Sequence, residues 1–280
     1  MNRAGLAAKL QDEGPAMNVI ETARCFSLDL DGIIHVGANS GQERVIYRDA
    51  GAKTVLFIEP IEAVFRQLQE NLRGFEGQIA FKALCSNRNG DVVRFNIASN
   101  GGESSSMFDL GVHADIYPGI TYTRQEEMRT RTLDSIIETD FPRIPFNVLV
   151  IDVQGAEIQV LEGAASVLER VDAIFLEVSE VPLYKGGCTV DEVWTFLLAR
   201  GFRIKWLNIG RDGWGDAFFL REQVCDDTPP PDAGSNIALN KPAKQSSTSP
   251  WSRANDAQGA VNGVFSSKFG FHTNLEDNPW

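Results

Sequence analysis

The chain has 280 residues, of which 43% are hydrophobic and 23% charged, a composition that suits one α/β domain with a short additional segment. Its formal net charge of −12 disfavours the phosphate backbone of nucleic acids, so we expect no nucleic-acid substrate. The sequence has neither a signal-peptide core at its start nor an apolar run of the roughly 18 residues that a membrane span needs, and it therefore predicts a cytoplasmic protein.

Apolar runs alternate with segments of helical periodicity from residue 33 onward. Four runs are almost wholly apolar, as is typical of strands covered on both faces: IIHV at 33–36, TVLFIE at 54–59, NVLVIDV at 147–153 and AIFLEV at 173–178. Repeated strand–helix–strand units bury such strands between two layers of helices. The alternation therefore predicts a doubly wound α/β fold with a mostly parallel sheet.

Three segments between and after these strands are predicted to be helices. PIEAVFRQLQENL at 60–72 starts with a proline suited to the first turn and carries an apolar stripe. A second stripe follows Gly155 and runs from residue 158 to residue 168. Thr189 and Glu192 have the spacing of a capping box before a third helix, which is expected to end at Gly201.

The end of this region is predicted to close the sheet with an antiparallel strand. FRIKWLNI at 202–209 and DAFFLR at 216–221 are joined by a glycine-rich turn and have the pattern of a hairpin at the sheet edge. The stretch from about 84 to 132 fits the alternation less well, and we interpret it as an insertion on the substrate side.

Composition places the domain boundaries. Residues 226–235, DDTPPPDAGS, are polar and proline-rich, which is typical of a stiff exposed linker. We therefore expect a lead-in at 1–30, the main α/β domain at 31–225, the linker, and a separate segment at 236–280.

A glycine-rich turn after the first strand is the strongest chemical signal. Gly37 and Gly41 permit a sharp turn with Asn39 between them, and the helix that follows offers free N–H groups to an anionic group. Glu59 ends the next strand, where a carboxylate can accept hydrogen bonds from both hydroxyls of a ribose. The two features together predict a nucleoside-containing cofactor.

NAD is the alternative ligand for this turn. The dinucleotide fingerprint is G-x-G-x-x-G, whereas the turn here is G-x-x-x-G, which serves a pyrophosphate poorly. The spacing is compatible with a nucleoside that ends in an amino acid, as S-adenosylmethionine does. We therefore favour S-adenosylmethionine.

Carboxylates near the ends of two later strands are candidates for catalysis. Asp152 ends the third apolar run, Glu157 starts the next helix, and Glu177 lies near the end of the fourth run. The carboxyl ends of parallel strands border the ligand crevice, so Asp152 is the first candidate for a base that takes a proton from an acceptor hydroxyl. For Glu157 and Glu177, a helix-start carboxylate and a structural ion pair are equally good interpretations.

The sequence demands no metal, although the same carboxylates could hold a divalent cation such as magnesium. The four cysteines form no C-x-x-C pair, and the three histidines are too scattered to suggest a metal site. We assign no metal ligands.

Taken together, several motifs resemble the FkbM family of methyltransferases across roughly residues 30–205. They are IIHVGANSGQE at 33–43, FIEP at 57–60, ALCSNRNG at 83–90, SSSM at 104–107, TLD at 132–134 and VIDVQGAEIQVLEGA at 150–164. The resemblance implies the Rossmann-like class I methyltransferase fold, with a seven-stranded sheet and a reversed last strand. It also implies S-adenosylmethionine as cofactor and O-methylation of sugars or secondary-metabolite hydroxyls.

Carried over by position, the resemblance also implies cofactor contacts. Gly37, Asn39 and Gly41 would contact the methionine part, Glu59 the ribose, and Leu84 or Ser86 the adenine. His35 stands where the family usually has Asp, so the methionine amino group would be held by Glu43 or Asp152 instead.

The acceptor side is predicted from polar residues in the insertion and beyond it. The candidates are Ser104, Ser105, Ser106, Tyr122, Tyr184 and Lys185, which can hydrogen-bond a polyol. Our hypothesis is S-adenosylmethionine-dependent O-methylation of a sugar, glycan or hydroxylated small molecule, with N-methylation as a close variant. The alternatives are an NAD-dependent oxidoreductase and a non-catalytic glycan-binding protein, because a fold by itself decides no function.

The segment at 236–280 resembles the opening third of a discoidin-like carbohydrate-binding domain, of the kind found in fucose-binding lectins. SNIALNKPAKQSST, AVNG and FHTNLEDNPW carry this resemblance. Asn262 and Val264 stand where the calcium loop of that family usually has Asp and Asn. We therefore interpret the segment as an incomplete domain and expect neither calcium nor sugar binding from it.

Overall fold

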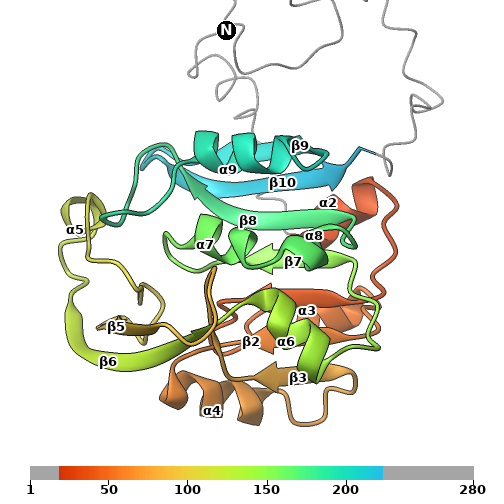
Figure 1. Ribbon diagram of the computed structural model, residues 1–280, viewed down its shortest axis with the longest axis horizontal. Helices are drawn as coiled ribbons and strands as arrows, with labels where there is room; N and C mark the ends of the chain where they lie inside the picture. Colours follow the sequence, from red (N-terminus) through yellow and green to blue (C-terminus); the bar gives the residue numbers. More distant parts are fainter. Residues whose placement is uncertain (1–18, 223–280) are drawn as a thin grey trace, which may run out of the picture. The chain divides into compact units, whose positions relative to one another are not determined.

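The computed structural model describes residues 19–222 (Figure 1). The predicted linker, the discoidin-like segment and most of the lead-in lie outside the described residues, so their boundaries stay predictions. Among the described helices, none has the length and apolar character required to cross a membrane.

A seven-stranded sheet with the order β3-β2-β1-β7-β8-β10-β9 forms the centre of the domain. Its strands are β1 (Ile33–Val36), β2 (Val55–Ile58), β3 (Gln78–Phe81), β7 (Val148–Ile151), β8 (Ala173–Ser179), β9 (Phe202–Ile209) and β10 (Trp214–Arg221). The first five strands in this order pair in parallel, and β10 is antiparallel to both of its neighbours. The predicted doubly wound sheet with an antiparallel last strand is confirmed, and β10 lies between β8 and the edge strand β9.

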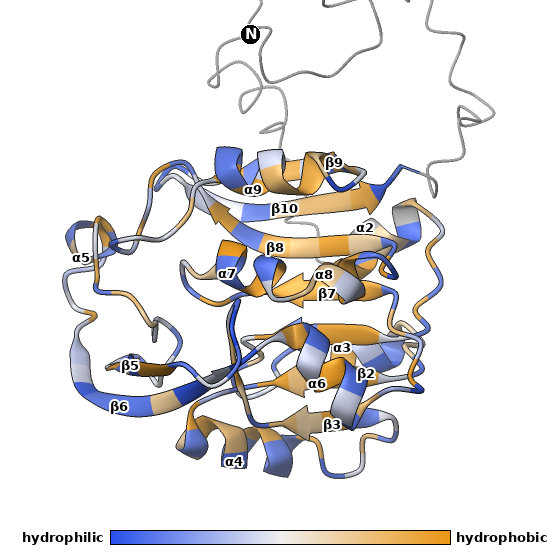
Figure 2. Ribbon diagram, in the orientation of Figure 1, coloured by the Kyte–Doolittle hydropathy of each residue, from blue (hydrophilic) through white to orange (hydrophobic). Residues whose placement is uncertain are grey.

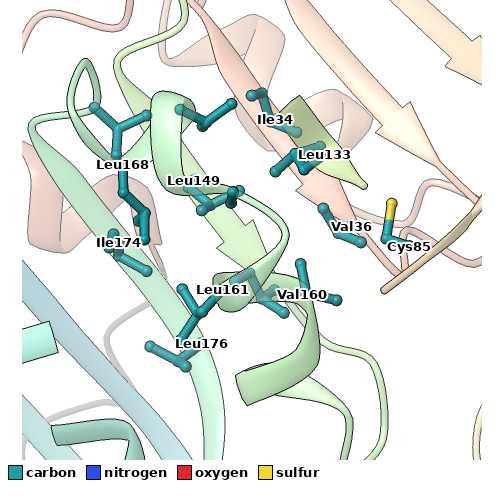
Figure 3. Packing of buried hydrophobic residues seen from close by; sticks show 14 of the residues in the cluster. Ile34, Val36, Cys85, Leu133, Leu149, Val160, Leu161, Leu168, Ile174 and Leu176 are labelled. Atoms are coloured by element: carbon teal, nitrogen blue, oxygen red, sulfur yellow. The ribbon is translucent and has the colours of Figure 1, made fainter. Parts of the chain in front are cut away.

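Alternate residues of each central strand face opposite layers of helices. Ile34, Leu56 and Leu149 belong to a core shared with α6 (Leu133–Asp140), α7 (Glu157–Glu162), α8 (Ala165–Leu168) and α9 (Val190–Leu198) (Figure 3). Ile33 and Val55 belong to a second core shared with α2 (Val19–Cys25), α3 (Arg44–Asp49) and α4 (Glu62–Asn71). Because both faces are covered, the central strands are mostly apolar, as the hydropathy colouring shows (Figure 2), and His35 in β1 and Glu177 in β8 are polar exceptions.

The insertion forms a second, three-stranded sheet with the order β4-β6-β5. It consists of β4 (Leu84–Cys85), β5 (Val92–Ala98), α5 (His113–Ile116) and β6 (Tyr122–Arg131), and it lies beyond the carboxyl ends of the parallel strands (Figure 1). Ile61, Leu84, Phe95 and Ile97 pack together in a small core of their own, which anchors the insertion against the loop after β2.

One helix prediction needs correction. The apolar stripe at 158–168 predicts one helix, but the chain forms α7 and α8 with a break at Gly163. The carboxylate of Asp134 accepts hydrogen bonds from the backbone N–H groups of Ser166 and Val167, both at 2.9 Å, and so starts a new helix there. The predicted capping box of Thr189 and Glu192 is confirmed.

Candidate functional site

A cavity of about 420 Å³ lies where the carboxyl ends of the central strands meet the insertion. This size is within the range of small-molecule and cofactor sites. Its lining includes predicted site residues from four strands and from the insertion: His35, Gly37, Asn39, Glu43, Glu59, Leu84, Ser104, Ser105, Asp152 and Glu177.

The glycine turn after β1 is held against the neighbouring strands. Gly37 has a φ of +81°, and a Cβ there would lie 1.7 Å from the backbone oxygen of Asp152. The N–H groups of Gly37 and Ala38 both donate to the Ile58 carbonyl, at 3.0 and 3.1 Å. Residue 37 must therefore be glycine for β1 and β7 to approach each other at the floor of the cavity.

Glu59 connects the glycine turn to the loop after β2. Its Oε2 accepts a hydrogen bond from Asn39 N at 3.1 Å, and its Oε1 accepts one from Ile61 N at 2.7 Å. Burial raises the pKa of this carboxyl to about 7, although both backbone hydrogen bonds act in the opposite direction. Glu59 is thus placed at the cavity wall, with lone pairs left for a ligand that donates hydrogen bonds.

His35 occupies the position where the FkbM resemblance leads one to expect an aspartate. Its Nδ1 lies 3.1 Å from the Tyr47 hydroxyl and 3.9 Å from Glu43 Oε2. Burial lowers the pKa of the imidazole, despite the nearby carboxylates of Glu43 and Asp152, which raise it. His35 is therefore predominantly neutral at neutral pH, and the ionisable group that its neighbourhood presents to the cavity is Glu43.

Gln154 joins the two candidate catalytic carboxylates. Its Nε2 donates to Asp152 Oδ1 at 2.6 Å and to Glu177 Oε2 at 2.9 Å. Its Oε1 accepts a hydrogen bond from the Tyr184 hydroxyl at 2.6 Å, and its backbone oxygen accepts one from Ser106 Oγ at 2.7 Å. A φ of +55° directs the side chain back across the ends of β7 and β8, a conformation rare outside glycine and common at functional sites.

The carboxyl groups around Gln154 have raised pKa values, and desolvation is the largest cause for each of them. Desolvation raises the pKa of Asp152, whose side chain faces the open cavity with protein on its other sides. Desolvation, followed by the charges of Asp152, Glu157 and Asp216, raises the pKa of Glu177 well above its ordinary value. Asp216 lies opposite Glu177 on β10, and desolvation raises its pKa to about 6. Raised carboxyl pKa values of this kind are typical of functional sites.

Residues 35–204 match the sequence model of the methyltransferase FkbM domain, which covers more than half of the chain. The chain belongs to the FkbM methyltransferase family. Membership favours methyl transfer over the NAD-dependent alternative.

One curated relative has a defined activity. Over 163 residues the chain is 28% identical to the 2-O-methyltransferase NoeI of Sinorhizobium fredii (strain NBRC 101917 / NGR234). This match covers 55% of the chain and 65% of NoeI, so the chain spans less than two thirds of its relative's length.

Solved structures with a similar arrangement include two methyltransferases. The ribosomal protein L11 methylase of Lactobacillus delbrueckii subsp. bulgaricus is 15% identical, with 72% of this chain and 74% of that chain covered and a TM-score of 0.42. The putative tRNA (m1A22) methyltransferase Sp1610 of Streptococcus pneumoniae, in complex with S-adenosyl-L-methionine, is 13% identical, with coverages of 72% and 71% and a TM-score of 0.43.

Several predicted site residues of this FkbM domain do not line the cavity. Glu157 is buried at the start of α7, where it accepts a hydrogen bond from Gly155 N at 3.1 Å and lies 3.3 Å from Cys188 Sγ. Its geometry is that of a helix-start carboxylate, the interpretation that the sequence left open. The others are Gly41, Ser86, Ser106, Tyr122, Tyr184 and Lys185, of which Ser106 and Tyr184 act on Gln154 instead.

The FkbM domain also brings residues to the cavity that the sequence did not single out. Gln154, His113, Tyr117 and Trp214 all line it. Gln154 stands within the predicted motif, so its polar side chain was an available signal. His113 begins α5, Tyr117 follows the end of that helix and Trp214 begins β10, so their meeting depends on the tertiary fold.

Within residues 19–222, no group of three or more His, Cys, Asp or Glu side chains is arranged to hold a metal ion. The Gln154 amide donates a hydrogen bond to each of the carboxyl groups of Asp152 and Glu177.

Proposed function

We propose that the protein transfers a methyl group from S-adenosylmethionine to a hydroxyl of a sugar or a similar hydroxylated molecule. The observation that carries this proposal is one cavity that is lined by Glu59 and the glycine turn and also by Asp152, Gln154 and Glu177. Membership of the FkbM methyltransferase family supports methyl transfer. The name of the relative NoeI, a 2-O-methyltransferase, supports a hydroxyl acceptor.

The cavity fits the chemistry of this cofactor. S-adenosylmethionine supplies an electrophilic methyl group on a positively charged sulfur, together with a ribose and an ammonium group. Glu59 would accept hydrogen bonds from the ribose hydroxyls, and Gly37 and Asn39 of the glycine turn would border the methionine part. Leu84 lines the cavity and Ser86 does not, so the adenine contact is proposed for Leu84.

The ammonium group of the cofactor would be held by carboxylates. Glu43 and Asp152 both line the cavity, beside the neutral His35. A cation is stabilised by nearby carboxylates in a partly desolvated site.

Asp152 is the proposed base, and Glu177 lies beside it as the second carboxyl group that Gln154 contacts. Methyl transfer is a displacement in line with the bond that breaks, so the protein contributes position and a proton acceptor. Asp152 would orient the acceptor hydroxyl and take its proton as the new carbon–oxygen bond forms. Gln154 would keep Asp152 in place through its 2.6 Å hydrogen bond.

Calorimetric titration of the full chain with S-adenosylhomocysteine and with NAD tests the cofactor. We expect binding of the first and none of the second. Binding of NAD alone would overturn the proposal in favour of an oxidoreductase. The activity test is incubation with S-adenosylmethionine and a panel of sugars, followed by mass spectrometry for a gain of one methyl group per product.

The non-catalytic alternative is distinguished by the same pair of measurements. A glycan-binding scaffold would bind sugars without forming S-adenosylhomocysteine, whatever the acceptor offered. A parallel reaction with chelator tests metal dependence, and we expect turnover to persist.

A further inference from the structure

The end of the cavity away from the glycine turn has an aromatic wall. Trp214 is the first residue of β10 and pairs with Ser179, the last residue of β8, so it stands at the carboxyl edge of the sheet. Its indole Nε1 donates a hydrogen bond to the Tyr117 hydroxyl at 2.8 Å. The rings of His113 and Tyr117 lie 5.2 Å apart. All three residues line the cavity.

The strand order separates this wall from the proposed cofactor residues. Glu59 follows β2, whereas Trp214 begins β10, and β1, β7 and β8 lie between those two strands. Four strand spacings of about 4.8 Å place the two residues roughly 19 Å apart along the sheet edge. Asp152, at the end of β7, stands between them. A cofactor bound near Glu59 would therefore leave the region beside Trp214 for the acceptor.

His113 contributes a polar atom to this region. The residue is 4% exposed, and its Nε2 lies 3.2 Å from Ser104 Oγ. Its Nδ1 is buried without a hydrogen-bond partner among the described residues. Buried polar atoms are rarely left unpaired, and a ligand hydroxyl is one group that would satisfy Nδ1 after a small adjustment of the ring.

The charge of the cavity wall is the second feature that bears on the acceptor. Five carboxyl side chains line it: Glu43, Glu59, Glu103, Asp152 and Glu177. No Lys or Arg from residues 19–222 is among the lining. Glu59 and Glu177, whose pKa values burial raises, carry only part of a negative charge near neutral pH, so the other lining carboxylates supply most of the field. The one positive charge of S-adenosylmethionine would offset only part of it. A phosphate placed beside Trp214 would meet like charges in a partly desolvated space.

We propose that Trp214, Tyr117 and His113 form the acceptor subsite, and that it takes a saccharide or cyclic polyol without anionic groups. This inference rests on the proposed function. The aromatic faces would cover the apolar side of the ring, while hydroxyls pair with His113 and Asp152. Phosphorylated and nucleotide-linked sugars would be rejected by the carboxylates, which makes charge a specificity determinant of this site.

The test uses three matched probes on the full chain saturated with S-adenosylhomocysteine. They are a methyl hexopyranoside, its 6-phosphate and its 2-amino counterpart, and binding is followed by saturation-transfer NMR titration. We expect the neutral and amino probes to bind and the phosphate to bind at least about tenfold more weakly. Glu103→Lys, at the exposed rim, should reduce that difference.

Two variants assign the subsite. Trp214→Ala should weaken binding of the neutral probe at least about tenfold without changing S-adenosylhomocysteine affinity. Trp206→Ala is the matched control, because Trp206 stacks on Phe175 at 6.0 Å and does not line the cavity. Tyr117→Phe, which keeps the ring, provides a milder variant if Trp214→Ala lowers the melting temperature.

The outcomes separate this inference from the proposed function. If S-adenosylhomocysteine does not bind, the proposed function itself is wrong. If it binds but the phosphate probe binds as well as the neutral one, or if none of the three probes binds, the function stands and the acceptor subsite is overturned. Equal losses in Trp214→Ala and Trp206→Ala would overturn the assignment to Trp214.

Discussion

Gln154 Nε2 donates a hydrogen bond to Asp152 Oδ1 across 2.6 Å. The same nitrogen donates to Glu177, so one amide serves two carboxyl groups whose pKa values are raised by desolvation, and the charge of Asp152 raises the pKa of Glu177 further. A donor to the charged form favours that form. In the proposed mechanism, Gln154 is therefore a positioning residue that keeps Asp152 available as a proton acceptor.

The first prediction follows from this shared donor. Gln154→Ala should move the acidic limb of the turnover–pH profile to higher pH, because the carboxyls lose a hydrogen bond that favours their ionised forms. Near neutral pH we expect turnover to fall about tenfold. Gln67→Ala is the control, since Gln67 bonds Asn71 on the exposed face of α4. An unchanged profile in Gln154→Ala would show that the bridge has no role in proton transfer.

Tyr184 offers an indirect test of the same group. Its hydroxyl fixes the orientation of the Gln154 amide, so Tyr184→Phe should shift the profile in the same direction by a smaller amount. Tyr122→Phe is matched to it, because the Tyr122 hydroxyl donates a 2.7 Å hydrogen bond to the Phe108 carbonyl. A shift of equal size in both variants would point to a general loosening of the structure around the cavity instead of an effect through Gln154.

The second prediction concerns Asp152 itself. Asp152→Asn keeps the shape of the side chain and should leave β7 packed, while methyl transfer falls by about 10² or more through loss of the base. Stopped assays of S-adenosylhomocysteine formation, with and without chelator, measure this loss. Full-rate turnover by the variant, together with wild-type turnover that resists chelator, would exclude Asp152 as base and as metal ligand.

A third prediction follows from the position of Glu59 against the proposed ribose. Glu59→Ala removes two charge-assisted hydrogen bonds to the cofactor, each worth on the order of 1.5 to 3 kcal/mol, so affinity for S-adenosylhomocysteine should fall at least tenfold. The fold should survive, although the N–H groups of Asn39 and Ile61 lose their acceptor. Unchanged affinity in a folded variant would remove the ribose assignment.

The fourth prediction uses the pKa of Glu59, which burial raises from 4.5 to about 7. Between these values the folded state retains a proton that the unfolded state has lost. The contribution of Glu59 to the free energy of unfolding is therefore fully present below about pH 4.5 and declines as the pH rises to about 7. The melting temperature of ligand-free Glu59→Gln should fall less over this interval than that of the wild type. Parallel curves for the two proteins would contradict the raised pKa.

The fifth prediction concerns the close approach at Gly37. Gly37→Ala places a methyl group 1.7 Å from the Asp152 carbonyl oxygen, so we expect severe destabilisation or failure to fold. Gly51→Ala is a matched control with the same φ of +81° and nothing within 4 Å of the new atom. In the control, only the left-handed backbone conformation disfavours alanine, so we expect the free energy of unfolding to fall by about 1 kcal/mol. Chemical denaturation of both variants measures these losses. Similar losses in both variants would show that β1 and β7 can separate.

The central strands could be predicted from the sequence because burial on both faces leaves an uninterrupted apolar signal. β3 gave no such signal, since QIAF at 78–81 is short and half-buried at the sheet edge. The break between α7 and α8 depends on Asp134 of α6, which is far from this segment in the sequence. The apolar stripe at 158–168 therefore could not indicate the break.

The proposed cofactor residues could be predicted from the sequence, whereas the proposed acceptor residues could not. The glycine turn and Glu59 lie at consecutive strand ends, and the parallel fold brings such positions together. Trp214 and Tyr117 are separated by 97 residues and meet only because β10 enters between β8 and β9. Gln154 reaches Glu177 through a left-handed backbone that the residue type does not favour. Such contacts have no local sequence pattern.

The position of β10 in the sheet also determines the order in which the strands can pair while the chain is being synthesised. The edge strand β9 pairs only with β10 within the described sheet, although β9 precedes β10 in the chain. Until residue 214 and its successors have emerged, β8 keeps an open edge and β9 has no partner in that sheet. The glycine turn and Glu59 can therefore come together before Trp214 has been synthesised. At that stage the nascent chain has unpaired strand edges, which promote aggregation and are a reason for chaperone binding.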